Sequence, residues 1–156
     1  MIVKALSVRE PWASLFFVED ERAKRCENRS WPTMARYAEP FPFELIIQAS
    51  QTFSPKQCAK WGVDAETMPR GAAVGIVQVV ACMRRSEVAA YARESGRSHL
   101  VTPHHIRHIE GPWCWIIENP RRFPAPLPMR GYQGLFDVEI NSDFSDAIVQ
   151  AQPIHG

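Results

Sequence analysis

Gly71-Ala-Ala-Val-Gly-Ile-Val-Gln-Val-Val-Ala-Cys82 is the stretch that decides the fold. It is rich in valine, which predicts a long strand, and its glycines permit a bend or a close approach of another backbone. Apolar stretches at residues 43–50 and 113–118 are also typical of strands. Further outward, residues 2–8 and 131–140 supply a first and a last strand.

Short helices are expected between these strands. Residues 11–19 show helical spacing, Ser54 has the pattern of a helix cap, and Ser86 begins a third candidate that Gly96 should end. The strands and helices do not alternate regularly. Five or six strands with two or three short helices therefore predict an α+β fold, a small mixed or antiparallel sheet curled into a β-barrel with helices at its side and mouth.

Length and composition are those of an ordinary globular protein. The chain has 156 residues, 46% of them hydrophobic and 22% charged. No apolar run approaches the roughly 20 residues that cross a bilayer, and the N-terminus lacks the pattern of a secretory signal. We expect no membrane partner and a cytoplasmic location.

The near-neutral net charge of +1 hides an asymmetry. Every lysine and arginine lies at or before Arg130, so residues 1–136 carry +5 and the last twenty carry −4. We expect one domain over residues 1–140 and an acidic C-terminal extension over residues 141–156, a weak helix followed by a frayed tail. Fourteen of the 18 cations are arginine, which favours planar recognition of phosphates and carboxylates.

Cysteines and histidines do not form a recognisable motif. The four cysteines are far apart and include no C-x-x-C pair, so a disulfide framework or a zinc knuckle is not expected. His104 and His108 have the i,i+4 spacing of two metal ligands, but no neighbouring acid or cysteine completes a set. We expect no metal site and no cofactor, and neither a phosphate loop nor a serine nucleophile elbow is present.

The richest chemistry lies in Lys24-Arg-Cys-Glu-Asn-Arg-Ser-Trp31. If Glu27 to Trp31 is extended, Glu27, Arg29 and Trp31 share one face, and Lys24 can lean over them. A carboxylate between two cations stays ionised, and a lysine beside an arginine is pushed toward its neutral, nucleophilic form. Such a cluster can bind a polar planar ligand or perform acid–base chemistry. It can equally be an ion-pair network that pins a strand to a helix.

Five segments in order resemble the ASCH domain, a family of the PUA-like superfamily of small β-barrels, over roughly residues 3–140. Its signature G-x-K-x-x-E-x-R matches Lys24, Glu27 and Arg29, with Arg22 in place of the glycine. The matching segments are Leu6–Trp12, Lys24–Trp31, Gly71–Val80, Glu118–Pro120 and Pro126–Phe136.

The resemblance implies a cleft between barrel and helices, suited to RNA or a modified nucleoside. Relatives often have histidine where this chain has Gln48 and lysine where it has Arg130; both replacements keep a donor. One branch resembles amidohydrolases of N4-acetylcytidine, in which the lysine acts with a threonine. This chain has Glu27 at that position, which departs from that reaction.

We therefore expect an RNA-binding or nucleoside-binding domain. Its candidate ligand-binding residues are Lys24, Glu27, Arg29, Arg9, Trp31, Ser7, Ser30 and Arg130. One alternative is a metal-independent hydrolase, an amidohydrolase or ribonuclease with Lys24 and Glu27 catalytic; another is an accessory domain that binds protein.

Several of these assignments have a structural alternative. Arg9 is either a cleft residue or a surface arginine. Trp31 either stacks on a base or wedges against the barrel edge. Arg36 and Tyr37 lie on a proline-rich loop, where binding groups are often displayed.

Overall fold

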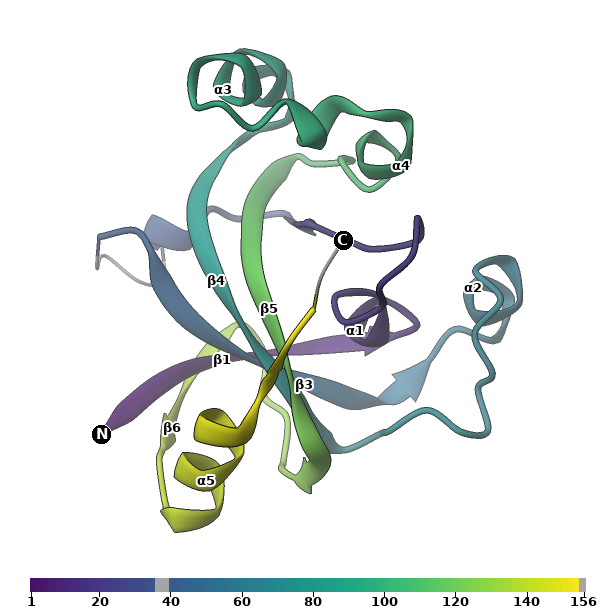
Figure 1. Cartoon of the computed structure of the whole chain (residues 1–156), viewed down its shortest axis with the longest axis vertical. Helices are drawn as coiled ribbons and strands as arrows, with labels where there is room; N and C mark the ends of the chain where they lie inside the picture. Colours follow the sequence, from purple (N-terminus) through teal and green to yellow (C-terminus); the bar gives the residue numbers. More distant parts are fainter. Residues whose placement is uncertain (36–39, 155–156) are drawn as a thin grey trace.

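The computed structural model describes residues 1–35 and 40–154, so the candidates Arg36 and Tyr37 lie outside the described residues. Its strands form one mixed sheet in the order β2-β5-β4-β3-β1-β6, with β7 added beside β5 (Figure 1). β1 and β3 run parallel, and the other paired strands run antiparallel. The strands are β1 (Ile2–Glu10), β2 (Cys26–Arg29), β3 (Phe43–Phe53), β4 (Ala72–Arg84), β5 (Trp113–Pro128), β6 (Leu135–Glu139) and β7 (Gln152–Pro153).

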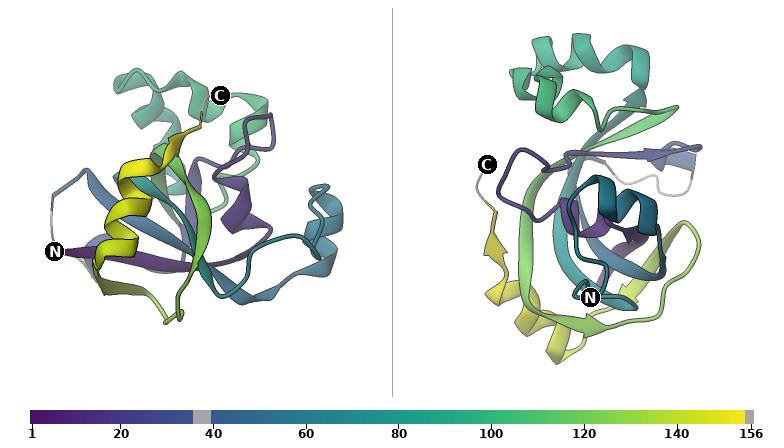
Figure 2. Two further views of the ribbon diagram at one scale, coloured as in Figure 1. Left: turned by 60° about the horizontal axis from the view of Figure 1, so that its bottom comes forward. Right: turned by 90° about the vertical axis from the view of Figure 1, so that its right-hand side faces the viewer.

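The sheet is strongly curved but open (Figure 2). Within the described residues its two end strands, β2 and β6, do not pair with each other, so the expected closed barrel is not confirmed. The mixed α+β class is confirmed; residues 1–35 and 40–154 form seven strands and five α-helices, where the sequence predicts fewer of each. The helices are α1 (Trp12–Leu15), α2 (Pro55–Lys60), α3 (Val88–Glu94), α4 (Pro103–Ile106) and α5 (Ser142–Gln150).

β5 is longer than the sequence predicts. The apolar pattern ends before Asn119-Pro120, but β5 continues through this pair to Pro128. Asn119 adopts φ 49°, a conformation that asparagine tolerates better than most residues. The register of the ladder between β4 and β5 shifts at this point, between the pairs Gln78–Glu118 and Ile76–Arg121, and pairing resumes beyond it.

The sheet has apolar residues on both faces. Leu45 and Ile47 of β3 belong to the core cluster that contains Phe16 and Phe17, directly after α1. Ile46, between them, belongs to a second cluster that includes Phe144 of α5. Alternate residues of a strand point to opposite faces, so the sheet is covered on both sides, which explains its nearly continuous apolar strands.

The C-terminal segment is docked on the sheet, contrary to the expected frayed tail, at least as far as residue 154. Asn141 caps α5 by accepting a hydrogen bond from the backbone N–H of Phe144 at 2.9 Å. Phe144 and Ala147 are buried, and β7 pairs with β5. No helix among the described residues is long and apolar enough to cross a membrane.

The helix caps agree with the sequence only in part. Ser54 caps α2 as predicted, because its hydroxyl accepts the Gln57 N–H at 3.3 Å. Ser86 does not begin α3. It lies within the 3₁₀ turn Arg85–Glu87, and the Glu87 carboxylate accepts the backbone N–H of Arg84 at 3.0 Å.

Candidate functional site

Lys24, Glu27 and Arg29 form a compact charged cluster, as the sequence predicts. The Nζ atom of Lys24 lies 2.5 Å from Oε1 of Glu27. Nη2 and Nε of Arg29 donate to the other oxygen, Oε2, at 2.8 and 3.2 Å. Glu27 and Arg29 are two residues apart on β2, and their contact shows that they project to the same face of the strand.

The cluster is unusually buried for a group of charged side chains. Only 4% of Lys24 and 4% of Glu27 is exposed. Burial alone would raise the pKa of Glu27, but the charges of Lys24 and Arg29 outweigh it, and the pKa is lowered from its ordinary value. The Nζ atom of Lys24 also lies 5.0 Å from the ring centroid of Phe16. Glu27 is therefore a carboxylate held ionised by its two neighbours.

Arg29 connects two strands that do not pair with each other. β2 is an end strand that pairs with β5, whereas β1 lies near the opposite end of the sheet, between β3 and β6. Nη2 of Arg29 donates to the backbone carbonyl of Ser7 on β1 at 3.0 Å. This contact places the end of β1 next to the charged cluster.

Asn28, on the opposite face of β2, fixes the loop behind the cluster. Its Oδ1 accepts the backbone N–H groups of Glu110 and Gly111 at 3.0 and 2.9 Å. Its Nδ2 donates to the carbonyl of His108 at 2.8 Å. One amide thus holds three residues of the loop that borders the site.

A cavity of about 300 Å³ opens beside the charged cluster. It lies between the end of β1, strand β2 and the loop that Asn28 holds. Its lining residues are Ser7, Val8, Arg9, Trp12, Lys24, Glu27, Asn28, Arg29, His108 and Glu110. We call it the lysine cavity.

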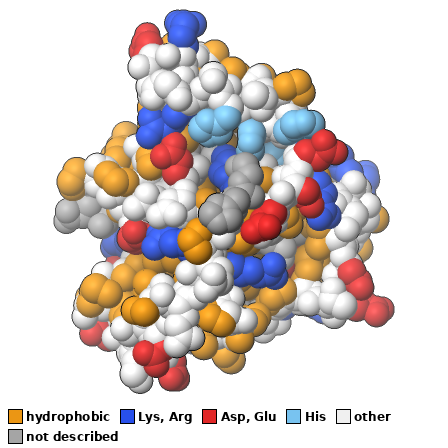
Figure 3. Space-filling view, viewed as in Figure 1, with side chains coloured by type: hydrophobic (Ala, Val, Ile, Leu, Met, Phe, Trp, Pro, Cys, Tyr) orange, Lys and Arg blue, Asp and Glu red, His pale blue; other side chains and the backbone are white. Residues whose placement is uncertain are grey.

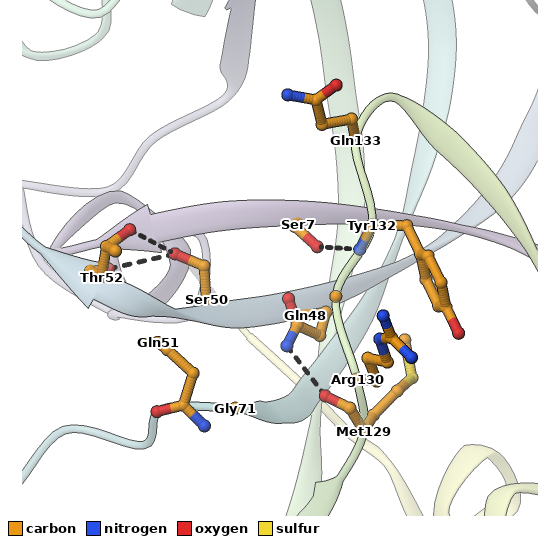
Figure 4. Close-up of a pocket in the computed structure, with 11 residues that line it drawn as sticks. Ser7, Gln48, Ser50, Gln51, Thr52, Gly71, Met129, Arg130, Tyr132 and Gln133 are labelled. Carbon is orange, nitrogen blue, oxygen red and sulfur yellow. Dashed lines mark hydrogen bonds between the residues drawn. The ribbon is translucent and has the colours of Figure 1, made fainter.

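Two larger cavities adjoin it and share Ser7 with it. The middle cavity, about 730 Å³, is lined by Ser7, Arg9, Arg29, Trp31, Ser50, Thr52, Tyr132, Gln133 and Gly134. The glutamine cavity, about 610 Å³, is lined by Ser7, Gln48, Ser50, Gln51, Thr52, Gly71, Met129, Arg130, Gly131, Tyr132 and Gln133 (Figure 4). The shared residues make the three cavities neighbouring parts of one cleft.

The structure brings most of the predicted residues to this cleft. Arg9 is exposed and lines both the lysine and the middle cavities. Arg130 lies farther away, in the glutamine cavity. Ser30 is exposed and lines none of these three cavities among the described residues, so this candidate is not supported.

Trp31 packs against the core and also borders the cleft. Its ring packs edge-on against Trp115, with centroids 5.1 Å apart, and it adjoins the main core cluster. It also lines the middle cavity. Trp31 is therefore a structural wedge that also borders the cleft.

Sequence reasoning misses several residues of the cleft, among them Tyr132, Gln133 and His108. Tyr132 and Gln133 lie just before β6, inside the matching segment Pro126–Phe136 but without being singled out by it. The sequence presents His108 only as a metal ligand, whereas its ring stacks on Trp61 with centroids 4.7 Å apart.

Arg22 replaces the signature glycine without strain. Among the described residues other than glycine, only Asn119 has a positive φ, so Arg22 does not adopt the conformation a glycine would favour. Its Nη1 donates to the carbonyls of Trp61 and Gly62 at 2.9 and 3.2 Å, and its side chain pairs with Asp20 at 2.7 Å. Arg22 thus ties the turn before the site to the end of α2.

Exposed histidine side chains of the described residues gather on one face (Figure 3) and do not form a metal cluster. Within the described residues, no group of three or more histidine, cysteine, aspartate or glutamate side chains could hold a metal ion. The Nε2–H of His108 donates to the carbonyl of Arg22 at 2.9 Å. Burial, helped by the nearby charges of Lys24 and Arg107, lowers the pKa of His108 to about 4.

Comparison with known proteins finds a distant likeness. No family model and no curated protein matches the chain. Among solved structures, it resembles the crystal structure of ASCH from Zymomonas mobilis, with a TM-score of 0.47 and 12% identity over 97% of each chain. Because this likeness is distant, the function of the chain has to be inferred from its own side chains.

Proposed function

We propose that the protein binds RNA or a nucleoside-type ligand in the cleft formed by the three cavities. The observation that carries this proposal is the arrangement around Glu27. Its carboxylate is fixed by Lys24 and Arg29, so both cations are held in place at the wall of an open cavity. Preorganised cations of this kind suit a phosphate or the polar edge of a base.

Unused donors support the same proposal. Nε and Nη2 of Arg29 are occupied, but Nη1 has no hydrogen-bond partner within the described part of the chain. Arg9 lines the same cavity and has no ion-pair partner among the described residues. Two arginines with free donors at one cavity mouth are typical of phosphate recognition.

The same geometry favours binding over hydrolysis. A general acid needs a pKa near the working pH, whereas the pKa of Glu27 is lowered. Both Glu27 oxygens already accept hydrogen bonds, and the ammonium group of Lys24 is engaged by one of them. The hydrolase alternative would require this cluster to rearrange. A protein partner stays a prediction.

Binding and hydrolysis can be separated in one experiment. Wild type, Lys24→Ala and Arg29→Ala are each incubated with N4-acetylcytidine and with a mixed pool of short RNAs, and bound and converted species are identified by mass. We expect retention of RNA or nucleoside by wild type, at least about tenfold weaker retention by both variants, and no product.

The control is Arg93→Ala, an exposed arginine on α3. It should bind like wild type and should show the same dependence on salt. Equal retention by wild type and Lys24→Ala would overturn the binding proposal. Product formed by wild type and not by Lys24→Ala would replace it with the hydrolase.

A further inference from the structure

The cleft is divided into compartments of different size. The lysine cavity has about 300 Å³, at the bottom of the range for small-molecule sites, which runs from roughly 300 to 1,000 Å³. The middle and glutamine cavities are each at least twice as large. The charged cluster therefore contacts only part of any ligand that fills the cleft.

The compartments also differ in chemistry. The lysine cavity contains charged groups of both signs. The glutamine cavity has no carboxylate among its described lining residues. Its polar side chains are the amides of Gln48, Gln51 and Gln133, the hydroxyls of Ser7, Ser50, Thr52 and Tyr132, and the guanidinium group of Arg130. Neutral amides and hydroxyls pair with the donor and acceptor edges of a nucleobase.

Gln48 supplies an acceptor that lacks a donor. Only 1% of this residue is exposed, and its Nε2 donates to the carbonyl of Met129 at 2.8 Å, which fixes the orientation of the amide (Figure 4). Its Oε1 is buried and has no hydrogen-bond partner among the described residues. A buried acceptor without a donor is uncommon in native proteins, and a bound ligand or water commonly completes it.

Gly131 brings the backbone into close contact with this acceptor. A Cβ atom there would lie 2.7 Å from Oε1 of Gln48 and 2.5 Å from Oγ of Ser7. The backbone is held this close because Oγ of Ser7 accepts the N–H of Tyr132 at 3.2 Å. The wall of the cavity at this point consists of backbone and one amide.

Tyr132 and Arg130 form a platform beside the amides. The guanidinium carbon of Arg130 lies 5.1 Å from the centroid of the Tyr132 ring. Tyr132 is 53% exposed and lines both larger cavities. A half-exposed ring beside a cation is the usual surface on which single-stranded bases stack.

Arg9 stands where the lysine cavity meets the middle cavity, because it lines both. It has no ion-pair partner among the described residues. A cation at the junction of two compartments is placed to neutralise a phosphate that links the groups on either side.

We propose that the ligand is a single-stranded oligonucleotide of at least two nucleotides. One base enters the glutamine cavity, paired with its amides and stacked at Tyr132, and the linking phosphate faces Arg9. The neighbouring nucleotide contacts Lys24 and Arg29. This inference rests on the proposed function and extends it from a nucleoside-sized site to a strand.

The test measures affinity against ligand length. Mixed-sequence RNA mono-, di-, tri- and pentanucleotides are titrated into wild-type protein and into Tyr132→Ala, with Arg93→Ala as the matched control. Wild type should bind dinucleotides at least about tenfold more tightly than mononucleotides. Tyr132→Ala should weaken dinucleotide binding by about 5- to 150-fold, the usual effect of losing one stacked base, and should change mononucleotide binding less than about twofold.

Two further variants keep the test decisive. Gln51→Ala changes an exposed amide of the same cavity and should weaken only the longer ligands. Arg9→Ala should reduce the slope of log affinity against log salt by about 0.7, the contribution of one single-strand phosphate contact. An unchanged slope would overturn the placement of the phosphate at Arg9.

The outcomes separate the two proposals. Equal affinity for mono- and dinucleotides, with no effect of Tyr132→Ala, would overturn the oligonucleotide inference alone. Length-dependent binding that is unaffected by Lys24→Ala and Arg29→Ala would instead overturn the proposed role of the charged cluster. Binding of no RNA at any length would overturn both.

Discussion

Lys24 and Glu27 are joined through Nζ and Oε1 at 2.5 Å, and only 4% of each residue is exposed. Moving two opposite charges out of water costs free energy, which their attraction repays only with good geometry and further hydrogen bonds. Arg29 supplies those bonds on the other carboxylate oxygen. The three residues should therefore behave as a unit when any one is changed.

Changing both partners should cost less than the sum of the two single changes. We expect Lys24→Met to lower the free energy of unfolding by about 3 kcal/mol, because Glu27 then keeps a single cation while buried. The double variant Lys24→Met/Glu27→Gln should lose less than the sum of the two single changes. Urea unfolding of all four proteins gives the coupling energy. Additive losses would show that the two groups do not interact in solution.

The stability of the protein should fall in acid through Glu27. Its pKa in the folded state is lowered from the ordinary 4.5, so its stabilising contribution is complete above pH 4.5. That contribution is lost progressively as the pH falls from 4.5 toward the pKa of the folded state. Glu27→Gln should flatten this part of the stability curve, which thermal unfolding from neutral pH down to about pH 3 will reveal.

Glu10 provides a control of opposite sign. It is fully buried and accepts hydrogen bonds from the backbone N–H and hydroxyl of Ser14 at 2.7 and 2.6 Å. Burial is the main reason that its pKa is raised. Its contribution is therefore largest below pH 4.5 and declines as the pH rises through the folded-state value. The stability of Glu10→Gln should decline less than that of wild type as the pH rises. If Glu10→Gln is instead less stable than wild type only at neutral pH, this assignment is wrong.

His108 should destabilise the fold when it is protonated. Its pKa is lowered to about 4 from 6.5, so the neutral ring contributes stability that is complete above pH 6.5 and is lost as the pH falls toward 4. The full effect is on the order of 3 kcal/mol. Titration of the ring protons by NMR gives the pKa directly. A midpoint at the ordinary value of 6.5 would mean that the ring is not buried in solution.

Helix α5 should be part of the folding unit. Phe144 is buried in a cluster with Ala5 and Ile46 of the sheet, so Phe144→Ala should lower the free energy of unfolding by about 3 kcal/mol. Val149→Ala, on the same helix but 82% exposed, is the matched control and should change it by less than about 0.5 kcal/mol. Similar values for the two variants would support a domain boundary at residue 140.

The charged cluster can be predicted from local sequence because its geometry depends on residues that are close together in the chain. Lys24, Glu27 and Arg29 lie within six residues, and strand alternation alone places the last two on one face. The cap of α2 is also predictable, because Ser54 and Gln57 are neighbours in the chain. Such features need no knowledge of how distant strands pair.

The rest of the cleft depends on long-range pairing. Ser7 and Tyr132 meet across 125 residues of sequence, and Arg29 reaches Ser7 although β1 and β2 are not paired. The predicted closure of the barrel also depends on pairing between distant strands. It is not confirmed, because the two end strands of the sheet, β2 and β6, do not pair within the described residues. Asn119-Pro120 misleads the strand assignment because an asparagine at φ 49° lets β5 continue past the irregularity.

Ser7 lines all three compartments of the cleft, which makes it a natural position for a reporter group. Three native cysteines, Cys26, Cys58 and Cys114, are buried and Cys82 is partly covered, so a thiol introduced at Ser7 could be labelled selectively under mild conditions. A fluorophore or spin label at this single position would sense occupancy of each compartment in turn. The shape of the cleft thus allows ligand screening before the ligand is known.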